Sequence, residues 1–153
     1  MTVEGSLYHT HVINENGLVG QSFVQGNEGL SLGVSSSLVN ASGTNPEQFI
    51  GFALSTCFNA TLRIVEQQRH IPQDTQVRTR VDIVKDSLGY KFIVDAQIMF
   101  PNENQTDAQS ILEDALNQCP VAKLLKENEN VNFRIVDAFT DDDTGDENRT
   151  FGE

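Results

Sequence analysis

Hydrophobic and polar residues alternate along three segments of the amino-terminal third. The segments run from Leu7 to Ile13, from Leu18 to Gln25 behind an Asn16-Gly17 turn, and from Gly29 to Ser35. A period of two residues is typical of a strand with one face buried, so this pattern predicts three successive strands. The residues from Ser35 to Ser42 then resemble a loop.

A long helix is predicted next. Asn45 suits the position that caps a helix, Pro46 suits the first helical position, and Gln48 stands where a capping box requires it. The helix should end near Arg69, before Pro72. Its apolar residues cover a wide arc, so we expect it to be largely buried. They are Phe49, Phe52, Ala53, Leu54, Phe58, Leu62 and Val65.

The second half of the chain predicts a hairpin, two helices and a last strand. Gln76 to Lys85 and Tyr90 to Phe100 form β-like runs around a turn at residues 86–89. An amphipathic helix should start at Thr106 or Asp107 and end at Pro120. A short helix is expected at Val121–Lys126 and a strand at Asn130–Val136. The order βββ-α-ββ-α-β predicts an α+β fold in two layers, with helices packed on an antiparallel sheet.

Composition and charge limit the number of domains and the classes of partner that the protein can have. A chain of 153 residues fits one domain, which we expect at residues 1–137, followed by an acidic and mobile tail at 138–153. The net charge of -12 argues against a nucleic-acid partner, whose phosphates it would repel. No long apolar run or basic leader is visible, so we expect no membrane partner and a soluble, cytoplasmic protein.

Two cysteines are the main candidates for chemistry. In a reducing compartment, paired thiols favour catalysis or metal binding over a structural disulfide. Cys119 would stand at the amino end of the helix that begins at Pro120, where backbone N–H groups favour a thiolate. Cys57 lies about three turns into its helix, and its neighbours include no cation. The alternative interpretation of Cys57 is a small buried hydrophobic residue.

Glu47 is the third candidate. It precedes Cys57 by ten residues, which is about 15 Å along one helix. The two side chains cannot meet within that helix, so a shared site would require Glu47 from a second copy of the chain. The alternative is an acid that is favoured in the first helical turn by the helix dipole.

The order of these motifs resembles that of the OsmC/Ohr family of thiol peroxidases. The resemblance rests on Gly43-Thr44-Asn45-Pro46-Glu47-Gln48, Cys57-Phe58 and Cys119-Pro120, and it covers about Leu7 to Val136. It implies an intertwined homodimer with active sites at the subunit interface and no cofactor. By resemblance, Cys57 is the peroxidatic residue that reduces organic hydroperoxides, Cys119 resolves its sulfenic acid to a disulfide, and Glu47 joins the active-site hydrogen bonds. A dithiol such as protein-bound lipoamide would reduce that disulfide.

One departure from the family weakens the peroxidase interpretation. Family members also use an amino-terminal arginine, whose positions fall here near residues 18–21 or near Ser37, yet the first basic residue is Arg63. The loss of such an ion pair typically costs about 10²–10³ in rate. Possible replacements are His9 and His11, Arg63 acting across the dimer, or Arg149 from the tail.

Other interpretations remain open. Phe49, Phe52 and Phe58 are mainly core residues, but in this family they would also line an apolar pocket for an alkyl hydroperoxide. The histidines and cysteines lack the spacing of a metal site, so we expect no metal. The alternative function is a binding or redox-sensing protein of the same fold that has lost turnover. The acidity of Cys57 distinguishes the two functions, because a peroxidase needs an ionised thiol near neutral pH.

Overall fold

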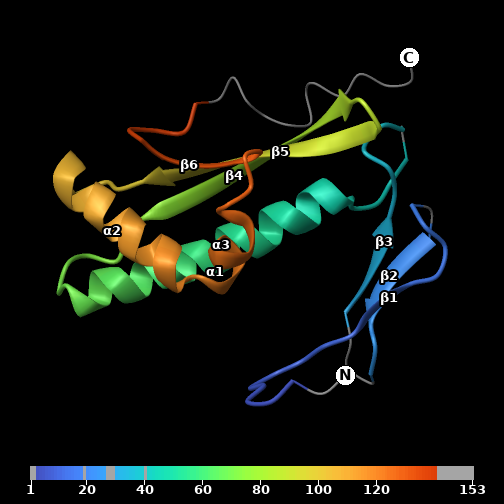
Figure 1. Cartoon of the computed structure of the whole chain (residues 1–153), viewed down its shortest axis with the longest axis horizontal. Coiled ribbons are helices and arrows are strands. Elements are labelled where there is room, and N and C mark those ends of the chain that lie inside the picture. Colours follow the sequence, from blue (N-terminus) through green and yellow to red (C-terminus); the bar gives the residue numbers. More distant parts are fainter. Residues whose placement is uncertain (1–2, 19, 27–29, 40, 141–153) are drawn as a thin grey trace. The chain divides into compact units, whose positions relative to one another are not determined.

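The computed structural model describes residues 3–18, 20–26, 30–39 and 41–140 (Figure 1). These residues fall into two compact units, which divide between Pro46 and Glu47. Residues 141–153, which make up most of the expected acidic tail, lie outside the described residues. One domain over residues 1–137 therefore stays a prediction.

The first unit is a three-stranded antiparallel sheet in the order β1-β2-β3. Its strands are β1 (Val12–Asn14), β2 (Gly20–Val24) and β3 (Ser31–Val34). Strand β1 is shorter than predicted: it begins at Val12, which pairs with Val24 at the end of β2, and the described residues 7–11 belong to no strand. The alternation at Leu7–Ile13 therefore overestimates this strand.

Gly43 and Thr44 join this sheet to the long helix. The backbone N–H of Thr44 donates to Gly33 (2.9 Å), and the N–H of Ser35 donates to Thr44 (2.8 Å). Gly43 has a φ of 126°, and a Cβ there would come within 3.0 Å of the Gly33 carbonyl oxygen. Only glycine meets both conditions without strain, which explains the glycine that opens the motif.

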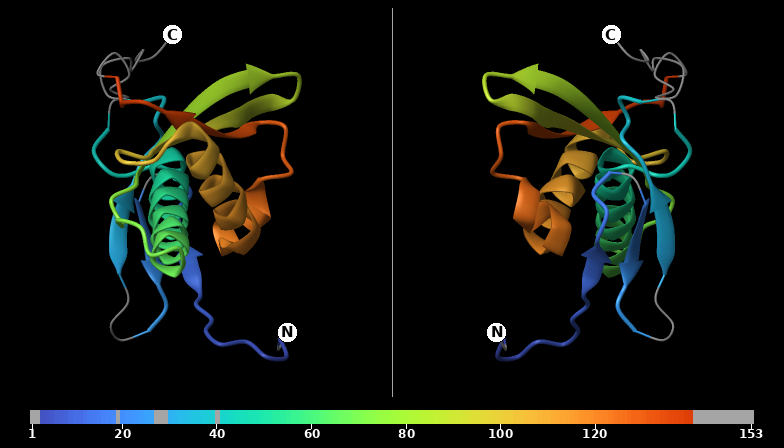
Figure 2. Two further views of the ribbon diagram at one scale, coloured as in Figure 1. Left: turned by 90° about the vertical axis from the view of Figure 1, so that its left-hand side faces the viewer. Right: turned by 90° about the vertical axis from the view of Figure 1, so that its right-hand side faces the viewer.

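The second unit packs its helices against one face of a second sheet, as Figure 2 shows. The chain forms a long helix, a hairpin, two consecutive helices and a last strand. Sheet order is β4-β5-β6. The elements are α1 (Pro46–Gln68), β4 (Gln76–Asp86), β5 (Gly89–Met99), α2 (Gln105–Gln118), α3 (Pro120–Leu125) and β6 (Val131–Val136).

The topology confirms the hairpin and corrects the sheet. Strands β4 and β5 are antiparallel and pair up to Asp86 and Gly89, as the turn residues predicted. Strand β6 is parallel to β5, so the expectation of a wholly antiparallel sheet is wrong. The chain leaves β5, crosses one face of the sheet through α2 and α3, and returns in the same direction, a connection that parallel strands require.

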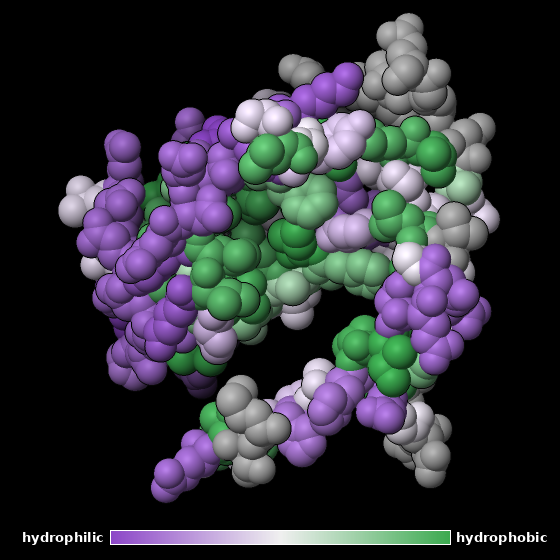
Figure 3. All heavy atoms as spheres, turned by 45° about the vertical axis from the view of Figure 1, so that its right-hand side comes forward, coloured by the Kyte–Doolittle hydropathy of each residue, from purple (hydrophilic) through white to green (hydrophobic). Residues whose placement is uncertain are grey.

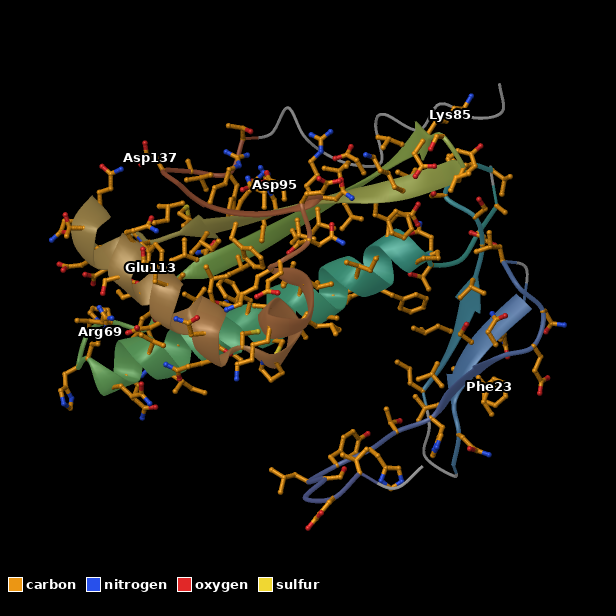
Figure 4. The ribbon with its side chains drawn as sticks, viewed as in Figure 1. Phe23, Arg69, Lys85, Asp95, Glu113 and Asp137 are labelled. Atoms are coloured by element: carbon orange, nitrogen blue, oxygen red, sulfur yellow. The ribbon has the colours of Figure 1, made fainter. Side chains whose placement is uncertain are left out.

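Helix α2 begins at Gln105, slightly earlier than predicted. Asn104 is its N-cap: its Oδ1 accepts from the N–H of Asp107 (2.9 Å), and its Nδ2 donates to the Asp107 carboxylate (2.7 Å). Arg69 directly follows α1 (Figure 4), and its guanidinium bonds to Ser110 and Asp114 of α2, which joins the end of α1 to α2.

The core lies between α1, the inner face of the sheet and α2. It consists mainly of aliphatic side chains, with Phe58 at its centre against Phe133 (ring centroids 5.2 Å apart). Its fully buried members include Leu54, Phe58, Leu62, Ala96, Ile98, Ile111 and Ala115.

Helix α1 is less buried than its sequence suggested. Phe52 is 66% exposed and Ile64 is 50% exposed, because the sheet and α2 cover only one side of the helix in the described chain. The expectation of a largely buried helix is therefore wrong for one of its faces. Hydrophobic and hydrophilic residues gather on separate parts of the visible surface in Figure 3.

Candidate active site

The packing brings together two thiols that lie 62 positions apart in the sequence. The Sγ atoms of Cys57 and Cys119 are 3.5 Å apart, within hydrogen-bond distance, and both thiols are free. A disulfide bond is about 2.05 Å long, so the sulfurs would need to approach by only about 1.5 Å to form one. This pair can therefore be oxidised to a disulfide with little movement of the backbone.

Cys119 is fixed by the junction of two helices. It ends α2, where its N–H donates to Ala115, and it is also the N-cap of α3. Pro120 forces this junction, since proline cannot continue α2 but suits the first position of a new helix. The Cys119 sulfur accepts a hydrogen bond from the Ala122 N–H (3.5 Å), and the residue is 0% exposed.

Cys57 lies on α1 at the edge of the core and is partly exposed. Burial raises the pKa of the Cys57 thiol, and the neighbouring Cys119 thiol raises it further, whereas a hydrogen bond from the Val121 backbone lowers it. Among the described residues, no lysine or arginine contributes to this pKa. In the single chain, the surroundings of Cys57 thus disfavour its thiolate form.

Backbone groups in the first turn of α3 form hydrogen bonds with both sulfurs, and the sequence did not predict this arrangement. Val121 supplies a backbone hydrogen bond to Cys57, while Ala122 supplies one to Cys119. The sequence signal was Pro120, which predicts a helix start next to Cys119. Nothing in the sequence indicated that this turn would also reach α1.

Within the second unit, Glu47 and Arg63 are not gathered around the thiols. Glu47 is buried in the first turn of α1, and since α1 is continuous, it remains about 15 Å from Cys57 along the axis. Arg63 donates instead to the backbone carbonyls of Gln73 and Thr75. His9 and His11 are exposed in the first unit, with ring centroids 5.6 Å apart, and Arg149 lies outside the described residues.

The three phenylalanines of the expected pocket have different environments. Phe58 is fully buried in the core, Phe49 is half-buried and Phe52 is exposed. A shallow hollow of about 630 Å³ does lie beside α1, but none of these rings lines it. Its lining is mostly polar and consists of Ser55, Thr56, Asn59, Ala60, Arg63, Gln73 and Val77.

A buried carboxyl on α1 was also missed. Glu66 is 1% exposed, and neither of its carboxylate oxygens has a side-chain hydrogen-bond partner among the described residues. Its pKa is raised to about 7, chiefly by burial and also by Asp74 and Glu103, while Arg63 and a hydrogen bond from the Thr75 backbone act in the opposite direction. Its sequence context, Val65-Glu66-Gln67-Gln68, resembles an ordinary solvated helix end and gave no signal.

The described residues contain neither a metal-binding cluster nor a helix able to cross a membrane. No group of three or more His, Cys, Asp or Glu side chains there is arranged to hold a metal ion. Among the described helices, none combines the length and apolarity that crossing a bilayer requires.

An α+β chain with a hairpin sheet, a long central helix and an adjacent thiol pair has the architecture of the OsmC/Ohr fold class. The model of the family "OsmC-like protein" matches residues 39–134, and the chain belongs to this family.

Several relatives carry names that concern hydroperoxides. The chain is 29% identical to organic hydroperoxide resistance protein-like 2 of Staphylococcus epidermidis, over 86% of this chain and 96% of that protein. It is 36% identical to the solved structure of a putative redox protein from Lactobacillus casei, with a TM-score of 0.83 over 90% and 96% of the two chains. The structure of OhrB from Bacillus subtilis matches with a TM-score of 0.75 at 23% identity, over 86% of this chain and 100% of that one, which shows a shared fold.

Proposed function

We propose that the protein is a thiol-dependent peroxidase that reduces organic hydroperoxides. The observation that carries this proposal is the 3.5 Å separation of the Cys57 and Cys119 sulfurs. The family membership, with its role in hydroperoxide resistance, supports the same conclusion. A cytoplasmic location belongs to the proposal as well, because a reducing compartment maintains such a thiol pair in its active form.

In the proposed cycle Cys57 is the nucleophile and Cys119 the resolving thiol. The Cys57 thiolate attacks the terminal oxygen of the hydroperoxide and the O–O bond breaks, which leaves a sulfenic acid on Cys57. The departing alkoxide takes a proton from water, in place of the proton that the thiol lost on ionisation, and leaves as the alcohol. Cys119 then attacks that sulfur, a disulfide forms, and water leaves. A dithiol, such as a lipoylated protein, returns the pair to its reduced state.

The proposal includes a homodimer, because one chain does not complete the site. The pKa of Cys57 is raised in the single chain, so an outside group must stabilise the thiolate. Glu47 of a second copy would join the site, together with whatever replaces the family arginine. Exposed Phe52 and Ile64 give α1 an apolar face that a second copy would cover.

The substrate pocket would form around the exposed side of Cys57. Phe49 and Phe52 are at least partly exposed, so their rings could contact the alkyl chain of a substrate. The ring of Phe58 is fully buried, so it would contribute to the core beneath the site and not touch the substrate. An apolar wall of this kind would favour alkyl hydroperoxides over hydrogen peroxide.

Stopped-flow oxidation of the reduced protein tests the proposal. We expect cumene hydroperoxide to oxidise Cys57 much faster than hydrogen peroxide does, and Cys57→Ser to abolish the reaction. Cys119→Ser should keep the first step and accumulate the sulfenic acid, which dimedone would trap. Turnover is then followed with dihydrolipoamide. Oxidation at the rate of a free thiol, with no preference for the organic substrate, would refute the proposal.

One observation favours a second candidate. The raised pKa of Cys57, with no basic side chain among its described causes, also suits a redox-sensing thiol pair or a binding protein without rapid turnover. That protein would still form the disulfide with a slow oxidant, but it would show no organic preference and no dihydrolipoamide-dependent cycle.

A further inference from the structure

We propose that the reductant attacks the sulfur of Cys57, and that Cys119 is always the sulfur released when the disulfide opens. This order of thiol exchange rests on the proposed function, since it concerns the reductive half of that cycle. It assigns distinct roles to two sulfurs that a symmetric disulfide bond would otherwise make equivalent.

The two sulfurs differ in access. Cys119 is 0% exposed and belongs to the core, where it packs with residues of α1, β5 and α2. Cys57 is partly exposed and only borders that core. An external thiolate must contact the sulfur that it attacks, so only Cys57 is within its reach without opening of the core.

The direction of approach leads to the same assignment. Thiol exchange proceeds through a nearly linear arrangement of three sulfurs, so the attacking thiolate enters opposite the leaving sulfur. Attack on Cys57 from solvent places Cys119 on the inner side, where its sulfur already lies 3.5 Å away. The reverse attack would bring the reductant through the packed core.

The leaving sulfur also has a hydrogen-bond donor in place. The Ala122 N–H donates to the Cys119 Sγ at 3.5 Å, in the structure with both thiols reduced. A donor that already points at this sulfur stabilises the negative charge that develops on it as the S–S bond breaks.

The exchange balances in two steps. A thiolate of the reducing dithiol forms a bond to the Cys57 Sγ, the Cys57–Cys119 bond breaks, and the electron pair leaves on the Cys119 Sγ. The second thiol of the reductant then attacks its own bound sulfur and releases the Cys57 thiolate. The dithiol is oxidised to its intramolecular disulfide, and its two protons end on Cys57 and Cys119.

Single-cysteine variants provide the first test. Cys119→Ala leaves only Cys57, and Cys57→Ala leaves only Cys119; both are treated with Ellman's reagent in the native state and in denaturant, and their melting is compared. We expect native Cys57 to react about tenfold faster or more than native Cys119, and the two to react alike once unfolded. Equal native rates in two folded variants, or a faster Cys119, would overturn the assignment.

A second test uses the wild-type disulfide, made with diamide so that no peroxidase activity is needed. It is mixed briefly with glutathione, quenched with acid, alkylated with N-ethylmaleimide in denaturant and mapped by peptide mass spectrometry. We expect glutathione on Cys57 and the maleimide on Cys119. Glutathione on Cys119 would overturn the proposal. If no adduct accumulates, the single-cysteine rates decide.

The two proposals can fail separately. Slow oxidation by cumene hydroperoxide, combined with glutathione on Cys57, would refute the peroxidase while leaving the order of exchange intact. Rapid peroxide turnover with glutathione on Cys119 would support the peroxidase and refute the proposed order of exchange.

Discussion

At the scale of single residues, the buried carboxyl of Glu66 couples stability to pH. Its pKa is about 7 in the folded chain against 4.5 for the free side chain, chiefly because burial disfavours the charged form. Between those values the folded state binds more protons than the unfolded state. The free energy of unfolding therefore falls as the pH rises from about 4.5 to about 7, and then levels off.

Glu66→Gln should remove this contribution. The raised pKa predicts that the wild type loses on the order of 2–3 kcal/mol relative to the variant across this window. Urea denaturation of both proteins at a series of pH values measures the difference directly. The exposed Glu113→Gln is the matched control and should track the wild type. A constant difference between wild type and Glu66→Gln from pH 4 to 8 would contradict the interpretation.

In the candidate site, the sequence predicted local features, such as a helix start, but not long-range contacts or burial. The helix start at Pro120 was readable, so Cys119 at a helix N-terminus was a correct prediction. The nearness of Cys57 to Cys119 came from the family resemblance, because 62 residues separate them and no local pattern encodes the contact. Their difference in exposure, and the burial of Glu66, depend on how α1 packs against the sheet and α2.

At the scale of elements, local signals located the helices and the hairpin but not their partners. Turn residues at 86–89 and the helix starts at Pro46 and Pro120 act over a few positions, so they are visible in sequence. The parallel pairing of β6 with β5 depends on a crossover of some thirty residues. The alternation at Leu7–Ile13 could not show where β2 would end, and the apolar arc of α1 could not show that one side stays open.

The N-cap of α2 has a testable contribution. Asn104→Ala removes the acceptor for the Asp107 N–H and should lower the free energy of unfolding by about 1 kcal/mol. Asn104→Ser keeps an acceptor at the cap and should recover most of the loss. Urea denaturation compares the three proteins. If both variants are equally destabilised, the loss comes from the Nδ2 bond to the Asp107 side chain instead.

Arg78 joins the outer face of the second sheet to the segment after β6. Its Nε and Nη2 donate to Gln97 Oε1 (2.9 and 2.7 Å), its Nη1 donates to the Thr140 carbonyl (2.9 Å), and it lies over the Phe139 ring (4.9 Å). Gln97 is only 2% exposed, so its oxygen relies on this partner. The buried oxygen of Gln97 therefore depends on one arginine.

Arg78→Ala should cost about 2 kcal/mol, because it leaves a buried acceptor without a donor. Lys91→Ala, an exposed change on β5, should stay within about 0.5 kcal/mol of the wild type. Thermal and urea denaturation both report the difference. A cost for Arg78→Ala no larger than that of the control would mean that water replaces the guanidinium at Gln97.

At the scale of the whole molecule, a single chain lacks features that the proposed peroxidase would need. The single chain raises the pKa of Cys57, holds Glu47 about 15 Å away along the axis of α1 and leaves hydrophobic side chains of that helix exposed. The homodimer proposed above would account for all three features if the second copy lay against α1. Oligomeric state and thiol acidity should therefore change together.

Ile64→Glu tests that link, because Ile64 is 50% exposed on α1 and lies outside the residues that we assign to the pocket. A charge in the middle of a dimer interface should shift the protein towards a monomer in analytical ultracentrifugation, since an unpaired buried carboxylate is costly. The monomer should oxidise at Cys57 more slowly, with the pH profile of a thiol moved to higher pH. Leu88→Glu is the matched control: Leu88 is 98% exposed at the β4–β5 turn, far in sequence from α1, and its substitution should leave both properties unchanged. A dimer that persists in Ile64→Glu would place the interface elsewhere, whereas a monomer with undiminished peroxide reactivity would show that one chain activates Cys57 by itself.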